Sequence, residues 1–409
     1  MKKLLAFGLA ATLSVAGMGV LAGCTESGDD SGEGSITVGL IALHDSNSTY
    51  DKNFIDAMQE ACENKGVKLL IRTGIPENQT CYDTASDLVD QGCDVIFADS
   101  FGHEDFVLQA ARENPDVQFC HATGTKAHTE GVANFHNAFA SIYEGRYLAG
   151  VAAGMKLVEM YEAGELETDN FDEDGNIKIG YVGAYPYAEV VSGYTSFFLG
   201  AQSVVEEETE ISISMEVTYT GSWYNEVAES EGANMLIGRG AALISQHADS
   251  MGAPSVCEAE GVPNVSYNGS TAEDCPNTFI VSSRINWVPY FEYMIDCVVN
   301  GEAIDTDWTG TIATGSVVLT EFGSAAADGT AEKVAEVQAQ LEAGTLHVFD
   351  CSKFTVNGEH LTSYMADVNT DTNWEPDTEA IADGIFEEST HRSAPYFDVH
   401  IDGITELNS

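Results

Sequence analysis

The chain has 409 residues, of which 44% are hydrophobic, and its formal net charge is −50 at pH 7. This length exceeds what one hydrophobic core usually supports, so it favours two lobes. The charge argues against a nucleic-acid partner, because phosphate binding needs clustered Lys and Arg. It favours a well-hydrated surface and a neutral or cationic partner.

The N-terminus has the pattern of an export signal. Two lysines precede an apolar run, Leu4–Ala22, which ends at Gly23 and Cys24. A basic start, an apolar run and small residues at the end are typical of a secretory signal. We therefore predict a signal peptide at residues 1–23. The alternatives are a plain signal peptide with a chance cysteine and an N-terminal membrane helix.

The ending Leu21–Cys24 resembles the lipobox of bacterial lipoproteins, in which a diacylglycerol is attached to the cysteine sulfur. The resemblance implies lipid attachment at Cys24, and two acyl chains give stable membrane binding. Residues 24–35 contain Gly, Ser, Asp and Glu but no large apolar side chain, so we expect a flexible tether. No later apolar run is long enough to cross a bilayer.

From Ile36 onward, apolar runs alternate with segments of helical spacing. Strands are expected at residues 36–43, 67–71, 95–98 and 117–120, and helices at 53–65, 80–91 and 104–113. This alternation predicts a parallel sheet with helices on both faces.

A second series of the same kind follows a long helical stretch at residues 139–162. Strands are expected at 177–183, 211–219, 242–245 and 262–267, and helices at 187–205, 224–237 and 250–260. Beyond it we expect a strand at 278–282, helices at 289–300 and 331–343, and a β-rich stretch at 311–320. Asn357-Gly358 predicts a tight hairpin turn, because both residues tolerate positive φ angles.

These series predict an α/β protein with two Rossmann-like lobes, a hinge and a ligand cleft. We assign residues 36–140 and about 278–310 to the N-terminal lobe. Residues 141–277 and about 311–409 form the C-terminal lobe, which includes segments that return through the hinge.

Catalytic and metal-binding motifs are absent from the sequence. It contains no G-x-S-x-G, P-loop or H-E-x-x-H pattern, so we expect no enzyme activity and no cofactor. The eight cysteines after Cys24 include no C-x-x-C pair, which argues against a zinc site. An exported protein can form disulfides, and Cys257 with Cys275 is a conceivable pair. We favour free thiols, although the spacing does not decide.

Ligand-contacting residues of an open α/β sheet lie beyond the carboxyl ends of its strands. The candidate ligand-binding residues at these positions are Tyr50, Asp51, Ser100, Phe101, Gly102, Tyr185, Trp223, His247, Asp249 and Asn268. They include aromatic and uncharged or acidic side chains but no Arg or Lys. This composition favours a flat, neutral ring with hydrogen-bonding nitrogens and fits an anion poorly.

Several motifs in the right order resemble the basic membrane protein (BMP) family of lipoproteins. The matching segments are Ala98–His103, Asn114–Val117, His121–Gly124, Tyr143–Gly150, Gly180–Gly183, Ser196–Ser203 and Ser245–Ser250. The similarity extends from about Ile36 to the Asn357-Gly358 turn. It implies a type I periplasmic-binding-protein fold and a purine nucleobase or nucleoside as ligand. It also implies an ABC permease and ATPase as partners, and a place on the outer face of the cell membrane.

The resemblance also assigns roles to single positions. Tyr50 falls where the family has an aromatic residue that stacks on the purine, and Trp223 matches an aromatic tip of the second lobe. His247 and Asp249 match the polar tip of a branch associated with adenine. Asn268 stands where nucleoside-binding members have an Asp that holds the ribose, so the resemblance favours a free base.

The sequence leaves two other functions possible. The fold also serves binding proteins for sugars and signalling molecules. A nucleoside hydrolase on the cell surface is a further alternative, which would require a positioned base or a metal that the strand ends do not supply.

Overall fold

The computed structural model describes residues 36–368 and 375–408. The predicted signal peptide, the tether and Cys24 lie outside the described residues. No helix in the described ranges is long and apolar enough to cross a membrane.

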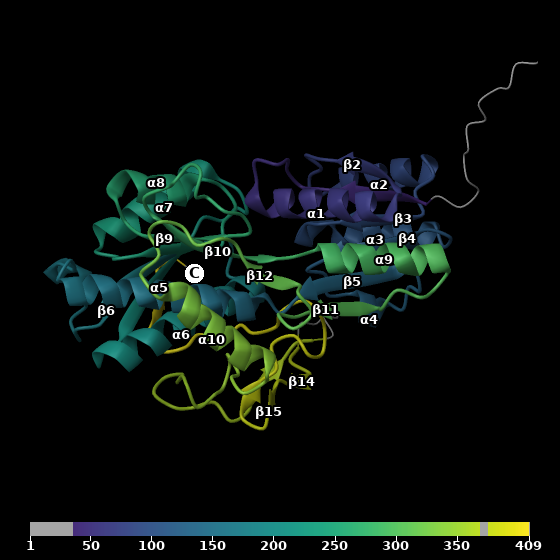
Figure 1. Ribbon diagram of the computed structural model, residues 1–409. Coiled ribbons are helices and arrows are strands. Elements are labelled where there is room, and N and C mark those ends of the chain that lie inside the picture. Colours follow the sequence, from purple (N-terminus) through teal and green to yellow (C-terminus); the bar gives the residue numbers. More distant parts are fainter. Residues whose placement is uncertain (1–35, 369–374, 409) are drawn as a thin grey trace, which may run out of the picture. The chain divides into compact units, whose positions relative to one another are not determined.

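The first sheet has six strands, all paired in parallel (Figure 1). In spatial order they are β11 (Asp307–Gly310), β5 (Phe135–Ala140), β4 (Gln118–Ala122), β3 (Val95–Ala98), β1 (Thr37–Ile41) and β2 (Lys68–Arg72). Its helices are α1 (Thr49–Lys65), α2 (Gln79–Asp90), α3 (Glu104–Glu113), α4 (Ala127–Glu130) and α9 (Val288–Asn300). One apolar cluster lies under α1, and another lies under α2 and α3 on the opposite face.

The second sheet has seven strands, which are parallel except for the pair β10–β12. In spatial order they are β12 (Val317–Leu319), β10 (Phe279–Ile285), β9 (Asn264–Tyr267), β8 (Ile244–Gln246), β6 (Ile177–Gly183), β7 (Ile213–Tyr219) and β17 (Ile404–Glu406). Its helices are α5 (Ile142–Ala163), α6 (Ala188–Thr209), α7 (Glu226–Gly238), α8 (Gly252–Glu260) and α10 (Thr330–Glu342).

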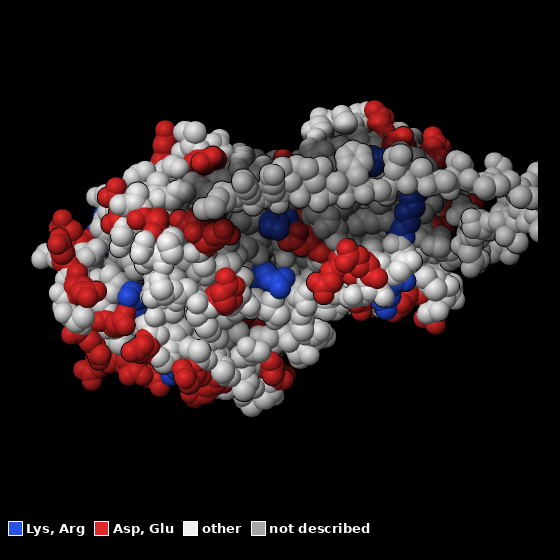
Figure 2. Space-filling view, turned by 45° about the horizontal axis from the view of Figure 1, so that its top comes forward, with Lys and Arg blue, Asp and Glu red and all other residues white. Residues whose placement is uncertain are grey.

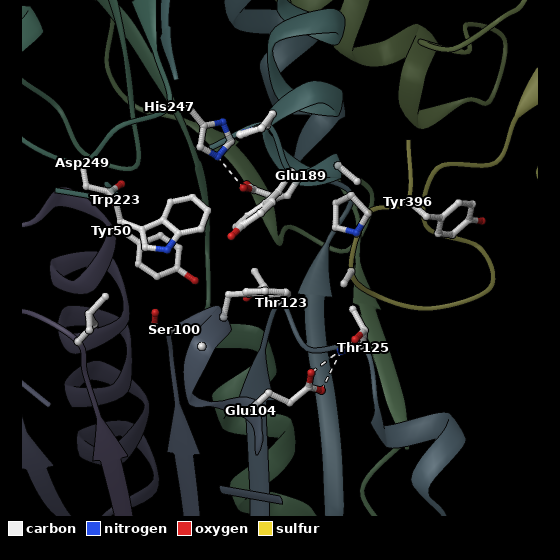
Figure 3. Close-up of a pocket in the computed structure, with 18 of the residues that line it drawn as sticks. Tyr50, Ser100, Glu104, Thr123, Thr125, Glu189, Trp223, His247, Asp249 and Tyr396 are labelled. Carbon is white, nitrogen blue, oxygen red and sulfur yellow. Dashed lines mark hydrogen bonds and ion pairs between the residues drawn. The ribbon is translucent and has the colours of Figure 1, made fainter. Parts of the chain in front are cut away.

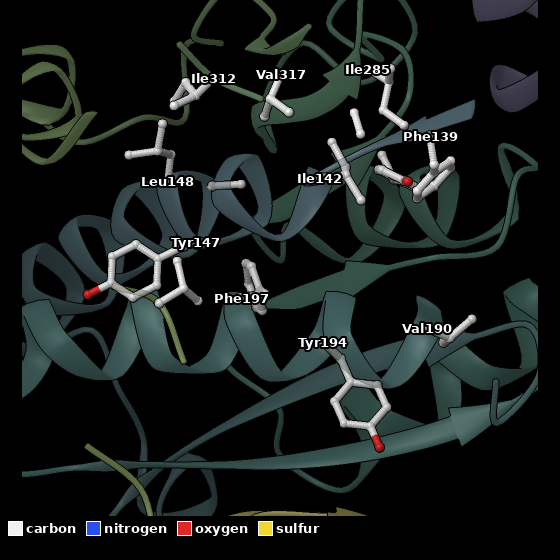
Figure 4. Packing of buried hydrophobic residues seen from close by; sticks show 14 of the residues in the cluster. Phe139, Ile142, Tyr147, Leu148, Val190, Tyr194, Phe197, Ile285, Ile312 and Val317 are labelled. Carbon is white, nitrogen blue, oxygen red and sulfur yellow. The ribbon is translucent and has the colours of Figure 1, made fainter. Parts of the chain in front are cut away.

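Helices α5 and α6 pack so closely that glycines of each helix face the backbone of the other (Figure 4). A Cβ atom on Gly150 would lie 2.1 Å from the carbonyl oxygen of Phe197, and one on Gly200 would lie 2.1 Å from that of Tyr147. Any larger residue at either glycine would push the helices apart. This close contact lies next to Arg146 near the start of α5 and at the middle of α6, whose first turn contains Glu189.

The structure differs from the sequence predictions at two places. Phe139 and Ala140 end strand β5 and do not begin the predicted helix, which starts at Ile142. All six residues of β5 are buried, but His136 and Asn137 interrupt its apolar pattern, so periodicity did not reveal a strand. The segment 278–310 is also divided: β10 joins the second sheet, and the chain returns to the first lobe after Ile285, at α9.

The chain beyond α10 contains short strands and loops. β13 (Met365–Ala366) pairs with β14 (Thr378–Glu379), and β15 (Ile381–Ala382) pairs with β16 (Ile385–Phe386). The predicted hairpin turn is confirmed, because Val356 bridges Glu359, with φ of 52° at Asn357 and 82° at Gly358. Phe349 stacks on Phe397 with 4.1 Å between ring centroids, which forms the centre of a small apolar cluster.

The charged side chains on the surface are mainly acidic where Figure 2 shows it. Asp and Glu are spread across this face in many patches, and Lys and Arg are few. Of the eight cysteines after Cys24, all are buried and none is paired, in agreement with the favoured free thiols.

Candidate functional site

A cleft of about 590 Å³ lies between the two sheets, beyond the carboxyl ends of their strands (Figure 3). Its walls come from both lobes and from the chain beyond α10. Pockets of roughly 300–1,000 Å³ hold drug-sized ligands, so this cleft suits a small organic molecule.

Tyr50 is held in the cleft wall at the start of α1. The helix begins at Ser48, whose hydroxyl accepts the backbone N–H of Asp51 at 3.2 Å. The Tyr50 hydroxyl donates to the carbonyl oxygen of Asp99 at 2.7 Å, and its ring packs against Phe54 at 4.8 Å. The ring is therefore fixed before any ligand arrives, which lowers the entropic cost of stacking.

Aromatic side chains of the second lobe face the same end of the cleft. Tyr185 stacks on Tyr187 at 5.2 Å and meets Trp223 edge-on at 5.1 Å. Phe101 of the first lobe reaches Tyr187 across the cleft at 5.6 Å. Phe101 and Tyr187 are 39% and 43% exposed, so part of each ring is open to the cleft that both line. Together with Trp223 they offer stacking surfaces from both lobes.

The two lobes also touch through their backbones at this end. The N–H of Thr49 donates to the carbonyl oxygen of Asp249 at 3.2 Å, and the N–H of Asp249 donates to the carbonyl oxygen of Trp223 at 2.9 Å. Tyr50, Trp223 and Asp249 thus belong to one connected group of residues.

A buried network of hydrogen-bonded side chains positions the carboxylate of Glu189 in the second-lobe wall. Arg146, at 1% exposure, donates to the Nδ1 atom of His247 at 2.8 Å. The Nε2 atom of His247 donates to Glu189 at 2.6 Å, and the Tyr267 hydroxyl donates to the other oxygen of Glu189 at 3.2 Å. The guanidinium also lies 3.4 Å from the ring centroid of Tyr267.

This network of Arg146, His247 and Tyr267 keeps Glu189 ionised. Since Arg146 donates to Nδ1, His247 is a neutral ring that carries its proton on Nε2. Burial lowers the pKa of His247, which agrees with that state. Burial alone would raise the pKa of Glu189, but His247 and then Arg146 outweigh it and lower this pKa. Glu189 therefore presents a fixed hydrogen-bond acceptor to the cleft.

The pKa of Asp249 is shifted in the opposite direction to that of Glu189. Burial, followed by the charge of Asp51, raises the pKa of Asp249 well above its usual value. Burial also opposes the ionisation of Asp51, but hydrogen bonds from the side chain and backbone of His44 lower the pKa of Asp51. The protonated form of Asp249 is therefore favoured, and in that form it can donate to a ring nitrogen, whereas Asp51 is committed to His44 and Ser48.

The loop after β3 is shaped by Glu77. The Ser100 hydroxyl and the Gly102 N–H donate to one oxygen of Glu77 at 2.7 and 2.8 Å. A Cβ atom on Gly102 would lie 2.4 Å from the carboxyl carbon of Glu77, so a larger residue there would displace the Glu77 side chain from this loop.

The structure brings most of the predicted site residues together. Tyr50, Asp51, Ser100, Phe101, Gly102, Trp223, His247 and Asp249 line the cleft. Tyr185 lies behind Tyr187, and Asn268 is buried with its amide 3.5 Å from Asp249, so neither reaches the cleft. Ligand contact by any of these residues stays a prediction.

Sequence reasoning missed several residues of the cleft wall. Glu189 follows the β6 end by six residues and looks like an ordinary residue of a helix start. Lys126 and Arg392 also line the cleft, so the prediction of a wall without Arg or Lys holds only for the strand ends that were considered. Carboxylates still outnumber these cations in the wall, which disfavours an anionic ligand. Among the described residues, no group of three or more His, Cys, Asp or Glu side chains is arranged to hold a metal ion.

Buried carboxyls of the hinge region predict a pH-dependent stability. Burial raises the pKa of Glu144 and of Glu388 to about 7 from 4.5. The folded state therefore retains protons that the unfolded chain has lost above pH 4.5, so the contribution of these two carboxyls to stability falls as pH rises from about 4.5 to about 7. Burial lowers the pKa of His103, His121 and His136 to about 4 from 6.5, and these rings contribute with the opposite sign. The carboxyl contribution is therefore measured by comparing the protein with variants.

Two variants isolate the carboxyl contribution. Relative to the original protein, Glu388→Gln should shift the change of the urea midpoint from pH 5 to pH 7 toward a rise, because it removes one of the two carboxyls. Glu336→Gln, at an exposed position of α10, should leave that change as in the original protein. If Glu388→Gln and the original protein showed the same change of midpoint between these pH values, the assignment of Glu388 would be contradicted.

Comparison with known proteins places the chain in a family. The model of the Bmp family, described as ABC transporter substrate-binding protein PnrA-like, matches residues 40–344. The chain belongs to this family. The resemblance predicted from the sequence motifs is thereby confirmed, and the family is one of substrate-binding proteins and not of enzymes.

Two curated relatives are each 30% identical to this Bmp-family chain. A putative ABC transporter glucose-binding protein of Haloferax volcanii matches over 262 residues, which are 64% of this chain and 60% of that protein. A purine-binding protein of Brucella abortus matches over 259 residues, which are 63% of this chain and 66% of that protein. The matched segment thus spans less than two thirds of either relative.

A solved structure confirms the predicted fold. An ABC transporter solute-binding protein of Aeropyrum pernix K1 aligns with a TM-score of 0.63 at 14% identity, covering 80% of this chain and 94% of that one. The two-lobe α/β architecture is therefore that of solute-binding proteins of ABC transporters.

Proposed function

We propose that this Bmp-family chain is the extracytoplasmic solute-binding protein of an ABC importer and binds a purine base or nucleoside between its lobes. The observation that carries the proposal is the aromatic end of the cleft, where Tyr50 and Trp223 line the wall together with the carboxyls of Glu189 and Asp249. A purine has flat faces for stacking and an edge with both donors and acceptors. The ionised Glu189 accepts from such an edge, and Asp249, in the protonated form that burial favours, donates to it.

Binding requires only a change in the balance between open and closed lobes. A ligand that contacts both lobes has a higher affinity for the closed state and shifts the population toward it. The rings of Tyr50 and Phe101 come from one lobe, and those of Tyr187 and Trp223 come from the other. The closed form would then dock on a permease, whose ATPase subunits drive uptake. No covalent step is involved.

The relatives supply independent support for the ligand class. The Brucella abortus relative is named a purine-binding protein. The motif resemblance favours adenine among the purines.

Lipid attachment at Cys24 completes the proposal, because a binding protein without its own transport machinery must stay near its permease. Two acyl chains and the tether of residues 24–35 would hold it at the outer face of the cell membrane. We expect Cys24→Ser, expressed in a bacterium that processes lipoproteins, to move the protein from the membrane fraction to the medium or periplasm. Equal membrane recovery of the original and substituted proteins would exclude this anchor.

A thermal-shift panel tests the ligand class. We expect adenine, adenosine or guanosine to raise the melting temperature, because a ligand that binds only the folded state stabilises it. Ribose and glucose serve as comparison ligands. No shift with any purine at millimolar concentration would reject the proposal.

A sugar is the second candidate ligand, and one observation favours it. The Haloferax volcanii relative is named a putative glucose-binding protein. A shift with glucose, without any shift by purines, would establish this alternative.

A further inference from the structure

The end of the cleft opposite Tyr50 is formed by a part of the chain that the family match does not include. The match ends at residue 344, but Arg392 and Tyr396 also line the wall. We call residues 387–399 the C-terminal strap. Figure 3 shows Tyr396 of the strap at one side of the cleft and Tyr50 at the other.

Both ends of the strap are held by the second lobe. At its start, the Ser192 hydroxyl on α6 donates to Glu388 at 2.5 Å, and both residues are buried. Beyond its end, strand β17 pairs with β7 of the second sheet. The Glu406 carboxylate on β17 also accepts the hydroxyl of Tyr194 on α6 at 2.7 Å. The strap should therefore move together with the second lobe.

The middle of the strap reaches the first lobe. The N–H of Ser393, a fully buried residue, donates to Oδ1 of Asp307 on β11 at 2.6 Å. The other carboxylate oxygen of Asp307 lies 3.2 Å from Nδ1 of His128, which also belongs to the first lobe. The Ser389 hydroxyl lies 3.2 Å from that of Ser141, where β5 of the first sheet leads into α5 of the second lobe. The strap thus leaves the second lobe, passes the hinge, touches the first lobe at Ser393 and returns.

Arg392 fixes the backbone around this point of contact. Its side chain is 7% exposed and donates to the carbonyl oxygens of Ala394 and Pro395 at 3.1 and 3.0 Å. It also donates to two carbonyl oxygens of residues 367–368 at 3.2 and 3.1 Å. Because the backbone is already held in place, the N–H of Ser393 is presented to the first lobe at little further cost in entropy.

The lobes also touch directly at the Tyr50 end of the cleft, where the N–H of Thr49 donates to the carbonyl oxygen of Asp249. Opening of the lobes about the hinge would separate these two residues. Since the strap moves with the second lobe, the same motion would pull Ser393 away from Asp307. A hydrogen bond to a charged group stabilises more than one between neutral groups, so this contact favours closed lobes.

We propose that the C-terminal strap is a latch, which favours the closed arrangement of the lobes through the hydrogen bond from Ser393 to Asp307. By shifting the balance toward the closed state, the latch slows the release of a bound ligand. It acts on the motion of the lobes and applies to any ligand that the cleft takes, so it goes beyond the proposed purine-binding function. The latch belongs to the part of this chain that follows the family match.

Hydrogen exchange of the ligand-free protein, read at single amides by mass spectrometry, tests the latch. Asp307→Ala removes the acceptor of the Ser393 N–H and should speed exchange of the Thr49 amide at least fivefold, because this amide exchanges when the lobes separate. Asp307→Asn retains an oxygen that accepts this N–H, so exchange of the Thr49 amide should stay within twofold of the original. The Asn137 amide donates to the carbonyl oxygen of Thr306 at 2.9 Å inside the first lobe and should not change in either variant.

Asp94→Ala is the matched control. Asp94 also accepts a backbone N–H, from Thr37 at 2.7 Å, but both residues belong to the first lobe. This variant should leave exchange of the Thr49 amide unchanged. In stopped-flow displacement with adenosine as the probe, Asp307→Ala should speed dissociation at least fivefold, and Asp94→Ala should change it less than twofold.

Two results would overturn the latch. In one, Asp307→Ala leaves exchange of the Thr49 amide at the original rate. In the other, it speeds the Asn137 amide as much as the Thr49 amide, which would mean that the first lobe itself has loosened. If the original protein binds no adenosine, the proposed function fails, but hydrogen exchange without ligand still decides on the latch.

Discussion

Replacing Tyr50 with alanine is expected to weaken purine binding by about 5- to 150-fold. A base stacked on an aromatic side chain contributes about 1–3 kcal/mol, and about 1.4 kcal/mol corresponds to tenfold in affinity. The Tyr50 ring is held in the first-lobe wall by its hydrogen bond to the carbonyl oxygen of Asp99 and its contact with Phe54. Calorimetric titration with adenine and adenosine measures the loss.

Two further variants separate stacking from other effects. Tyr50→Phe retains the ring and loses only the hydrogen bond to Asp99, so its affinity should remain within about threefold of the original. Tyr161→Ala removes a tyrosine that is 39% exposed on α5 and does not line the cleft, so purine affinity should not change. An unchanged affinity of Tyr50→Ala would remove Tyr50 from the site.

Replacing Arg146 with methionine is expected to lower the free energy of unfolding by about 3–5 kcal/mol. Removing one partner of a buried charge network leaves the other charge uncompensated, which costs about this much. Arg146 is 1% exposed and bonds to His247 and to the carbonyl oxygen of Gln246. Urea denaturation measures the change, and a weaker affinity for purines should accompany it, because Glu189 loses its support.

A matched arginine and a double variant test this explanation. Arg239 donates two hydrogen bonds to Glu216 at 2.6 Å but is 50% exposed, so Arg239→Met should cost less than about 1 kcal/mol. Combining Arg146→Met with Glu189→Gln should recover part of the lost stability, because the uncompensated carboxylate is removed. If Arg146→Met and Arg239→Met lowered the free energy of unfolding equally, the buried network would not be important for stability.

The fold was largely predictable from the sequence because strands and helices alternate with strong apolar patterns. The strand Ile177–Gly183, for example, coincides with the prediction at both ends. Strand β5 was not recognised, because its buried His136 and Asn137 form hydrogen bonds with Gln118 and Ala127 that a single sequence does not reveal. The topology of the last strands was equally hidden, since β17 pairs with β7 across nearly two hundred residues.

The candidate site was predictable only where it follows strand ends. Tyr50, Ser100 and Trp223 were found by this rule, and they line the cleft. Glu189 lies inside a helix, and its importance depends on Arg146 and His247, which are far away in sequence. Arg392 lies in a segment without periodicity, so no local pattern could place it at the cleft.

A titration of the purified protein with adenosine tests the central claim most directly. We predict saturable binding of one adenosine per chain, with competition by adenine and none by glucose. The absence of binding by adenosine and adenine, at concentrations where glucose binds, would contradict the account.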